Sequence, residues 1–231
     1  MSIYHILDHV YSYNSNEEEE ENIHTSFQCY GSKRNRRTRI FNVTFFGKSI
    51  LTTITSKPSE IKNWIYSSLY HNRYHRYILV VELGVQCSTN ASDDPAETLQ
   101  ICIGTRCLII QLSHSPYVPK ILRRFLGNVN ITFVGIWNYS DNSNLLNSKH
   151  QLSVSKLINL SNYRTENHPS SGSMENLVRD HLGFEGVRKD ERIGRSNWNA
   201  KYLSCDQVEY PTVDAHASFE IGKKVRAWME G

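Results

Sequence analysis

Residues 77–85 read YILVVELGV, an apolar run that is interrupted by one carboxylate, Glu82. A run of this length with this β-branched content is typical of a central strand that is buried on both faces. It is far shorter than the ~20 apolar residues that cross a bilayer. We therefore expect this stretch to form the middle strand of a globular domain.

Two hairpins are predicted before and after this strand. Residues 39–45 and 49–55 are rich in β-branched and aromatic side chains and are separated by Gly47. Residues 98–103 and 106–112 have the same character and are separated by a Gly-Thr pair. Short turns between such segments favour antiparallel hairpins.

Helices and further strands alternate along the rest of the chain. Strands are predicted at 131–136 and near 157–160, and helices at 58–69, 119–126, 141–150, before Gly183 and from Ser204 to about Trp228. Ser204 and Gln207 have the spacing of a capping box at the start of the last helix. The pattern predicts an α/β fold: a mixed sheet flanked by helices, with an N-terminal β-hairpin.

The chain divides into two unequal parts. Its 231 residues suffice for one packed domain, which we expect at 38–231. Residues 1–37 contain the acidic run 17–21 and the basic cluster 33–37, and we expect them to form a charged, poorly ordered arm. The basic cluster could be a nuclear signal, a phosphate contact or a solvated linker. No secretory leader is recognisable, so the expected location is the nucleus, the cytosol or both.

Five segments form a recognisable pattern in a fixed order. They are residues 42–46 with 52–55, 96–104 with 106–109, 133–136 with Asp141, 196–198, and 203–210 with 214–222. Together they resemble the plant Werner-syndrome-like 3′–5′ exonucleases of the ribonuclease-H-like superfamily, over about four-fifths of the chain. The resemblance implies a ribonuclease-H-like α/β fold with a mixed sheet of five to six strands.

The resemblance also implies a catalytic pattern, D-x-E…D…Y-x-x-x-D. In this family four carboxylates hold two divalent cations, Mg²⁺ or Mn²⁺, which promote attack of water on the 3′-terminal phosphodiester bond. Asp141 matches the carboxylate that opens a helix, while Tyr210 and Asp214 match the last pair, which shares one helix face. These three are the candidate catalytic residues, and Asp141 and Asp214 are candidate metal ligands.

The first-strand motif departs from the family. Where the family reads V-G-L-D-V-E-W, residues 81–87 read VELGVQC, so that Gly84 and Gln86 replace the two carboxylates. Glu82 stands at the family's glycine position, on the same strand face as Gly84 but displaced by roughly 6.6 Å. Glu82 is therefore a candidate substitute ligand, and cation binding is expected to be weakened.

Three functions remain open from the sequence. The first is a protein of this exonuclease family that binds DNA or RNA 3′ ends, with lost or strongly weakened hydrolysis. The second is an active metal-dependent 3′–5′ exonuclease that uses Glu82. The third is a non-catalytic subunit that forms a homo- or hetero-oligomer with active relatives. None of the three involves a membrane.

Basic residues before the last helix are candidate nucleic-acid contacts. They are Arg188, Lys189, Arg192 and Arg195. Lysine and arginine side chains contact phosphates in most nucleic-acid complexes. Ordinary surface charge explains these basic residues equally well. In the same way, Asp141 taken alone would be interpreted as the cap of a helix. Trp64 and Trp198 are expected in the core and not as base-stacking platforms.

Overall fold

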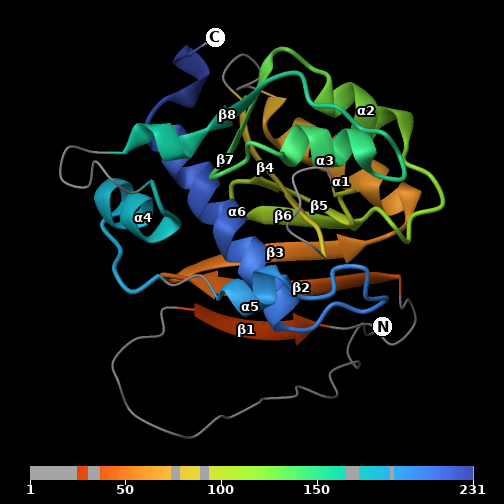
Figure 1. The fold of residues 1–231 in the computed structure, drawn as a ribbon, viewed down its shortest axis with the longest axis horizontal. Helices are drawn as coiled ribbons and strands as arrows, with labels where there is room; N and C mark the ends of the chain where they lie inside the picture. The colour runs from red at the N-terminus through yellow and green to blue at the C-terminus, as the bar shows by residue number, and fades with distance from the viewer. Residues whose placement is uncertain are drawn as a thin grey trace, which may run out of the picture.

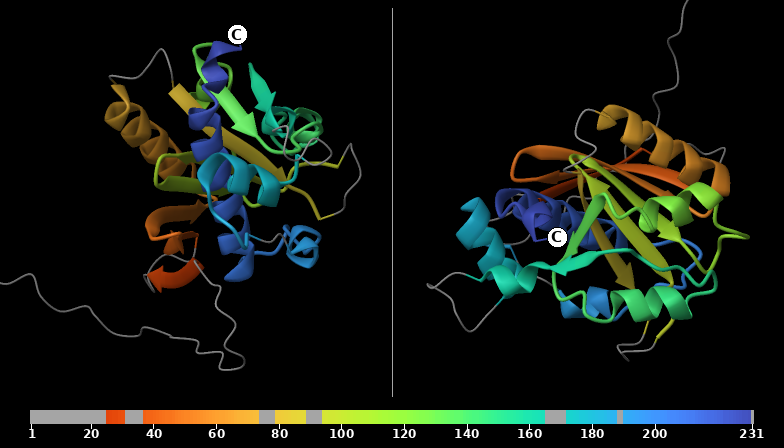
Figure 2. Two further views of the ribbon diagram at one scale, coloured as in Figure 1. Left: turned by 90° about the vertical axis from the view of Figure 1, so that its left-hand side faces the viewer. Right: turned by 90° about the horizontal axis from the view of Figure 1, so that it is seen from above.

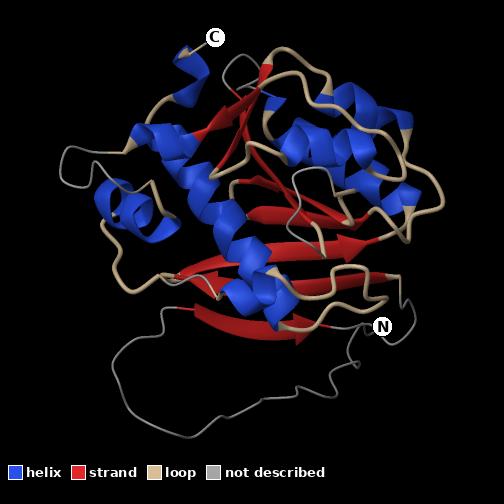
Figure 3. Cartoon of the chain, in the orientation of Figure 1, coloured by secondary structure: helices blue, strands red, loops and turns tan. Residues whose placement is uncertain are grey.

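The computed structural model describes residues 25–30, 37–73, 79–88, 94–164, 172–187 and 190–230. Within them, eight strands form one mixed sheet in the order β1-β2-β3-β6-β5-β4-β7-β8, with helices on both faces (Figures 1 and 3). The strands are β1 Thr25–Tyr30, β2 Thr38–Phe45, β3 Lys48–Thr55, β4 Leu79–Gln86, β5 Thr98–Ile103, β6 Arg106–Gln111, β7 Ile131–Gly135 and β8 Leu157–Asn159. The helices are α1 Pro58–His71, α2 Lys120–Leu126, α3 Asp141–Asn147, α4 Met174–Leu182, α5 Glu191–Gly194 and α6 Asp206–Lys224, with short 3-10 turns at Leu160–Tyr163 and Ala227–Met229.

The predicted α/β fold is confirmed, but the strand number is larger than the expected five or six. The N-terminal hairpin β2–β3 does not form a separate layer, because β3 pairs in parallel with β6 and so extends the central sheet. β1 then adds to the free edge of β2. β1 comes from the segment that we assigned to the charged arm, whereas residues 1–24 and 31–36 of that segment lie outside the described residues.

Strand β4 occupies the central position that its sequence predicts. It pairs antiparallel with β5 and parallel with β7, and Leu79–Gly84 are all buried. The core includes Val81 and Leu83, both with no exposed surface. Because β4 is covered on both faces, a polar side chain on it lies in the interior of the domain.

The two faces of the sheet carry different helices. On one face α1 packs against β6, where the Arg106 guanidinium donates a hydrogen bond to the Ser67 hydroxyl and lies over the Trp64 ring. On the other face α6 crosses the sheet, and the hydroxyl of Thr212 lies 3.1 Å from that of Thr52. Figure 2 shows α1 and α6 on opposite sides of the strands. Among the described helices, none is both long and apolar enough to cross a membrane.

The start of α6 is fixed by the predicted capping box. The backbone N–H of Gln207 donates to Ser204 Oγ at 3.2 Å, and that of Ser204 donates to Gln207 Oε1 at 3.0 Å. A second small core of Phe41, Ile54, Ile109, Trp198, Leu203 and Val208 attaches the preceding loop to the sheet. Trp198 has no exposed surface and Trp64 only 5 %, as expected of core residues.

Candidate functional site

A polar pocket of about 170 Å³ opens on the α6 face of the sheet. Its walls come from β4, β5, the turn between β7 and α3, the first residue of α4, and α6. The sequence-predicted residues that line it are Glu82, Gly84, Gln86, Asp141, Tyr210 and Asp214. The structure thus gathers in one pocket residues that are up to 132 positions apart in the chain, counted from Glu82 to Asp214.

Local geometry explains how each element delivers its side chain. Alternation along β4 places Glu82, Gly84 and Gln86 on the same face. Tyr210 and Asp214 are one turn apart on α6 and therefore share a face. At the end of β7, a Cβ on Gly135 would lie only 2.8 Å from the Leu83 carbonyl oxygen, so this glycine allows the turn that leads to α3 to approach β4.

The space beside Gly84 is filled by the side chain of Gln100. A Cβ at position 84 would lie 2.5 Å from Gln100 Nε2 and 3.1 Å from Glu82 Oε1. The Gln100 amide is hydrogen bonded to Glu82, and its Oε1 accepts a hydrogen bond of 3.3 Å from Gln86 Nε2. Two neutral amides therefore occupy the strand region where the resemblance leads us to expect carboxylates.

Glu82 is the carboxylate that β4 retains. Its side chain is 2 % exposed, and its Oε2 has no hydrogen-bond partner among the described residues. Burial raises the pKa of Glu82 well above its usual value, and the neighbouring Cys102, Asp214 and Asp141 raise it further. The hydrogen bond from Gln100 opposes this shift. The structure therefore favours the protonated, neutral form of Glu82.

These side chains do not fit a pair of divalent cations. Across the described ranges, no three His, Cys, Asp or Glu side chains lie close enough together to hold a metal ion. Hard cations need several oxygen ligands, preferably charged. Here Gln86 is neutral and hydrogen bonded, Gly84 has no side chain, and burial of Glu82 disfavours its charged form.

Two exposed aromatic residues near the rim of the pocket were not predicted from the sequence. Trp137, in the turn between β7 and α3, lines the pocket and is 55 % exposed. Its φ of +57° is unusual for a bulky residue, and its backbone N–H donates to Asn159 Oδ1 at 3.1 Å. The Tyr139 ring lies 5.9 Å from it and is 68 % exposed. In proteins that bind single-stranded nucleic acids, exposed aromatic rings are surfaces on which unpaired bases stack.

The structure describes two of the four basic residues that we predicted to contact nucleic acid. Arg188 and Lys189 lie outside the described residues. Arg192 and Arg195 belong to the α5 region, where they form exposed ion pairs of 2.8 Å with Asp190 and 3.2 Å with Glu191. α5 borders the pocket, because a Cβ on Gly194 would lie 3.1 Å from the Tyr210 hydroxyl. Both arginines are thus near the candidate site and do not line it.

Comparison with known families gives one match over most of the chain. Residues 85–230 match the family described as 3′–5′ exonuclease. A protein of Acanthamoeba polyphaga mimivirus, named as a candidate 3′–5′ exonuclease, is 24% identical over 187 residues. That alignment covers 76% of this chain and 46% of the viral protein, so the chain spans about half of that relative's length.

Several solved structures share the fold at low sequence identity. The catalytic core of Trypanosoma brucei RRP6 has a TM-score of 0.61 at 13% identity, covering 78% of this chain and 47% of that chain. Escherichia coli RNase D, an exoribonuclease, has a TM-score of 0.54 at 18% identity, covering 71% and 43%. Brucella melitensis NrnC, in a structure described as bound to pGG, has a TM-score of 0.54 at 16% identity, covering 67% and 76%.

Proposed function

Because the chain belongs to the 3′–5′ exonuclease domain family, we propose that it binds 3′ ends of DNA or RNA with lost or strongly weakened hydrolysis. The observation that carries the proposal is the composition of the pocket. Asp141, Tyr210 and Asp214 stand in it together, opposite a β4 strand that offers Gly84 and Gln86. The proposal therefore rests on a pocket that keeps three of the matched residues and has Gly84 and Gln86 where the family pattern has two carboxylates.

An exposed ring at the rim of the pocket and two arginines beside the pocket support binding of an unpaired terminal nucleotide. Trp137 offers a ring face at the rim, and base stacking on an aromatic ring contributes about 1–3 kcal/mol per base. Arg192 and Arg195 stand beside the pocket, where they can contact phosphates that precede the terminal nucleotide. That NrnC, a fold relative, is described with bound pGG agrees with this use of the fold.

An active exonuclease remains a second candidate because of one specific atom. Glu82 Oε2 is buried without a partner among the described residues, and it faces a pocket that also contains Asp141 and Asp214. A cation there would lower the pKa of Glu82 and make its carboxylate a ligand. In that case Mg²⁺ would bind at millimolar concentrations and stabilise the fold.

One pair of measurements separates the two candidates. We expect fluorescence anisotropy to show salt-sensitive binding of a 5′-labelled single strand with a free 3′ end, weakened at least fivefold by Trp137→Ala. Tyr117→Ala is the matched control, because Tyr117 is 62 % exposed and does not line the pocket.

The second measurement is thermal unfolding. We expect the unfolding temperature to stay within about 1 °C when Mg²⁺ is added, which is a small shift for a domain of this size. A larger rise that Asp214→Asn removes would favour the active enzyme, and absent binding would exclude both.

A further inference from the structure

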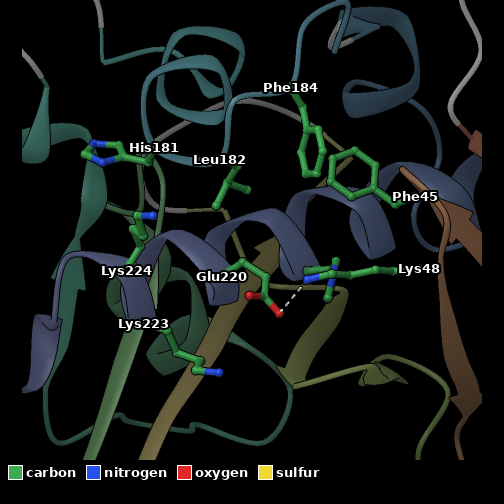
Figure 4. A pocket seen from close by; sticks show the side chains of 9 residues that line it. Phe45, Lys48, His181, Leu182, Phe184, Glu220, Lys223 and Lys224 are labelled. Carbon is green, nitrogen blue, oxygen red and sulfur yellow. Dashed lines mark ion pairs between the residues drawn. The ribbon is translucent and has the colours of Figure 1, made fainter.

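A second cavity is lined by residues of β2, β3, α4, α6 and the loop after α4 (Figure 4). Its volume is about 390 Å³, within the range of small-molecule sites. It is lined by the apolar side chains Phe45, Leu182 and Phe184, together with Lys48, Lys223 and Lys224. The cavity shares no lining residue with the candidate site.

The helix α6 keeps the two sites apart. Asp214 and Ser218 line the candidate site, whereas His216 and Glu220 line the second cavity. The second pair is offset by two residues, which is about 200° around an α-helix. A ligand in the second cavity is therefore separated from the candidate site by the body of the helix.

One wall of the cavity is a rigid group of aromatic rings. Phe184 stacks on Phe46 with 4.0 Å between ring centroids and an interplanar angle of 8°. Phe45 meets Phe184 edge-on at 6.2 Å, and its own side chain is 1 % exposed. Figure 4 shows Phe45 and Phe184 side by side above α6, with Leu182 next to them. Because Phe45 is buried, the half-buried Phe184 offers the ring surface that a flat apolar ring of a ligand can contact.

Three lysines around α6 contribute positive charge to the lining of the cavity. Lys48 pairs with Glu220 at 3.4 Å, while Lys223 and Lys224 are exposed and have no ion pair among the described residues. Lys223 Nζ lies 5.5 Å from the Phe219 ring centroid. Three ammonium groups against one carboxylate leave two positive charges in excess. A phosphate monoester, which carries nearly two negative charges at neutral pH, complements this charge.

We propose that this cavity binds a nucleoside monophosphate, with the base against the aromatic wall and the phosphate at the lysines. An aromatic wall alone would accept any apolar ligand, and lysines alone would accept any anion. Their combination in one cavity of this size selects a ligand with both parts. The site is distinct from the one that we propose for the 3′ end and does not depend on it.

Photolabelling with 8-azidoadenosine 5′-monophosphate, followed by peptide mapping, tests the proposal. We expect the label on peptides that contain residues 181–187 or 216–224. We expect adenosine 5′-monophosphate to compete at least tenfold better than either adenosine or inorganic phosphate. The double change Lys223→Gln, Lys224→Gln should reduce labelling at least tenfold. Lys62→Gln, Lys120→Gln is the charge-matched control, since both lysines are on helices of the opposite face.

Three results would overturn the proposal. The first is a label confined to peptides around residues 82–86 and 135–141, which line the candidate site. The second is labelling that the double lysine change leaves intact. The third is competition by an oligonucleotide as strong as that by the mononucleotide, which would reassign the cavity to the backbone of a bound strand. Asp214→Asn should leave labelling of this cavity unchanged, which separates it from the candidate site.

Discussion

Position 84 illustrates how one residue changes the chemistry of a whole pocket. An aspartate there would place a carboxylate between β4 and α6, whereas glycine leaves room that the Gln100 amide fills. The amide in turn is hydrogen bonded to Glu82 and accepts from Gln86, so three β4 and β5 side chains form a local polar network. This network gives the Glu82 carboxyl one hydrogen bond and leaves its Oε2 without a partner among the described residues.

The protonation of Glu82 makes folding stability depend on pH. Because its pKa is raised in the folded state, the folded chain binds more protons than the unfolded chain above the unfolded value near 4.5. Stability is therefore lost as pH rises from that value through the folded pKa. Glu82→Gln removes the charge and should raise the unfolding temperature at pH 8 by about 2–4 °C, the equivalent of ~1 kcal/mol in a domain of this size.

The control for this prediction is an exposed carboxylate. Glu185→Gln changes the same charge on the surface and should leave the pH profile of unfolding as it is in the unmodified chain. The advantage of Glu82→Gln should shrink as pH falls towards 5. Equal profiles for the two variants would contradict the buried, neutral state of Glu82.

At the scale of the element, β4 should accept the family pattern. Glu82→Gly, Gly84→Asp, Gln86→Glu displaces the end of a flexible Gln100 side chain and avoids a third acidic side chain on the strand. We expect this triple variant to gain a Mg²⁺-dependent rise in unfolding temperature and at least tenfold faster release of 3′ nucleotides. Adding Asp214→Asn should remove both gains. If Mg²⁺ stabilises the unmodified chain equally, Gly84 and Gln86 do not weaken metal binding.

The capping box sets where α6 begins, and α6 presents Tyr210 and Asp214. Ser204→Ala leaves the Gln207 N–H without its acceptor, and we expect a loss of about 1 kcal/mol, which lowers the unfolding temperature by about 2–4 °C. Ser59→Ala, an exposed change near the start of α1, should have little effect. An unchanged unfolding temperature in Ser204→Ala would show that the packing of Trp198 and Val208 alone fixes this helix end.

Local patterns predicted most elements, while long-range pairing set the rest. The apolar run of β4, the hairpins and the glycine that ends α2 are all visible in short windows. The parallel pairing of β3 with β6 and the addition of β1 join distant segments, so no short window contains that information. The positions of Asp141, Tyr210 and Asp214 came from the family pattern, and the structure brings them into one pocket.

Two site features depended on three-dimensional context. Gln100 reaches Gly84 only because the β4–β5 register sets them opposite each other. Trp137 reaches the rim through a left-handed backbone conformation in the turn after β7. A tryptophan next to a buried strand is typical of a core residue, so its exposure could not be predicted from its neighbours.

On the scale of the whole molecule, charge placement predicts how binding responds to salt. Arg192→Gln, Arg195→Gln removes two candidate phosphate contacts beside the pocket, and their exposed ion pairs contribute little to stability. For a single strand, the logarithm of the affinity falls with the logarithm of the salt concentration, and each lost phosphate contact makes this slope shallower by about 0.7. We expect the double change to reduce the slope by about 1.4 and the affinity at low salt about tenfold.

A charge-matched double change on the other face provides the comparison. Lys120→Gln, Arg124→Gln removes two exposed cations from α2, which lies with α1 on the face opposite the pocket. This variant should keep both the slope and the affinity of the unmodified chain. Equal losses in the two double variants would mean that net charge, and not a local contact, governs binding.

We propose above that the chain holds a 3′ end and does not cut it efficiently. The most direct test is the rate at which the unmodified chain releases the terminal nucleotide from 3′-labelled single-stranded and recessed duplex substrates in Mg²⁺ or Mn²⁺. Asp214→Asn supplies the background. We expect bound substrate and a rate at least roughly a thousandfold below that of a relative with the complete motif, about 4 kcal/mol in barrier height. A rate typical of such relatives, lost in Asp214→Asn, would contradict the claim and assign the missing ligand to Glu82.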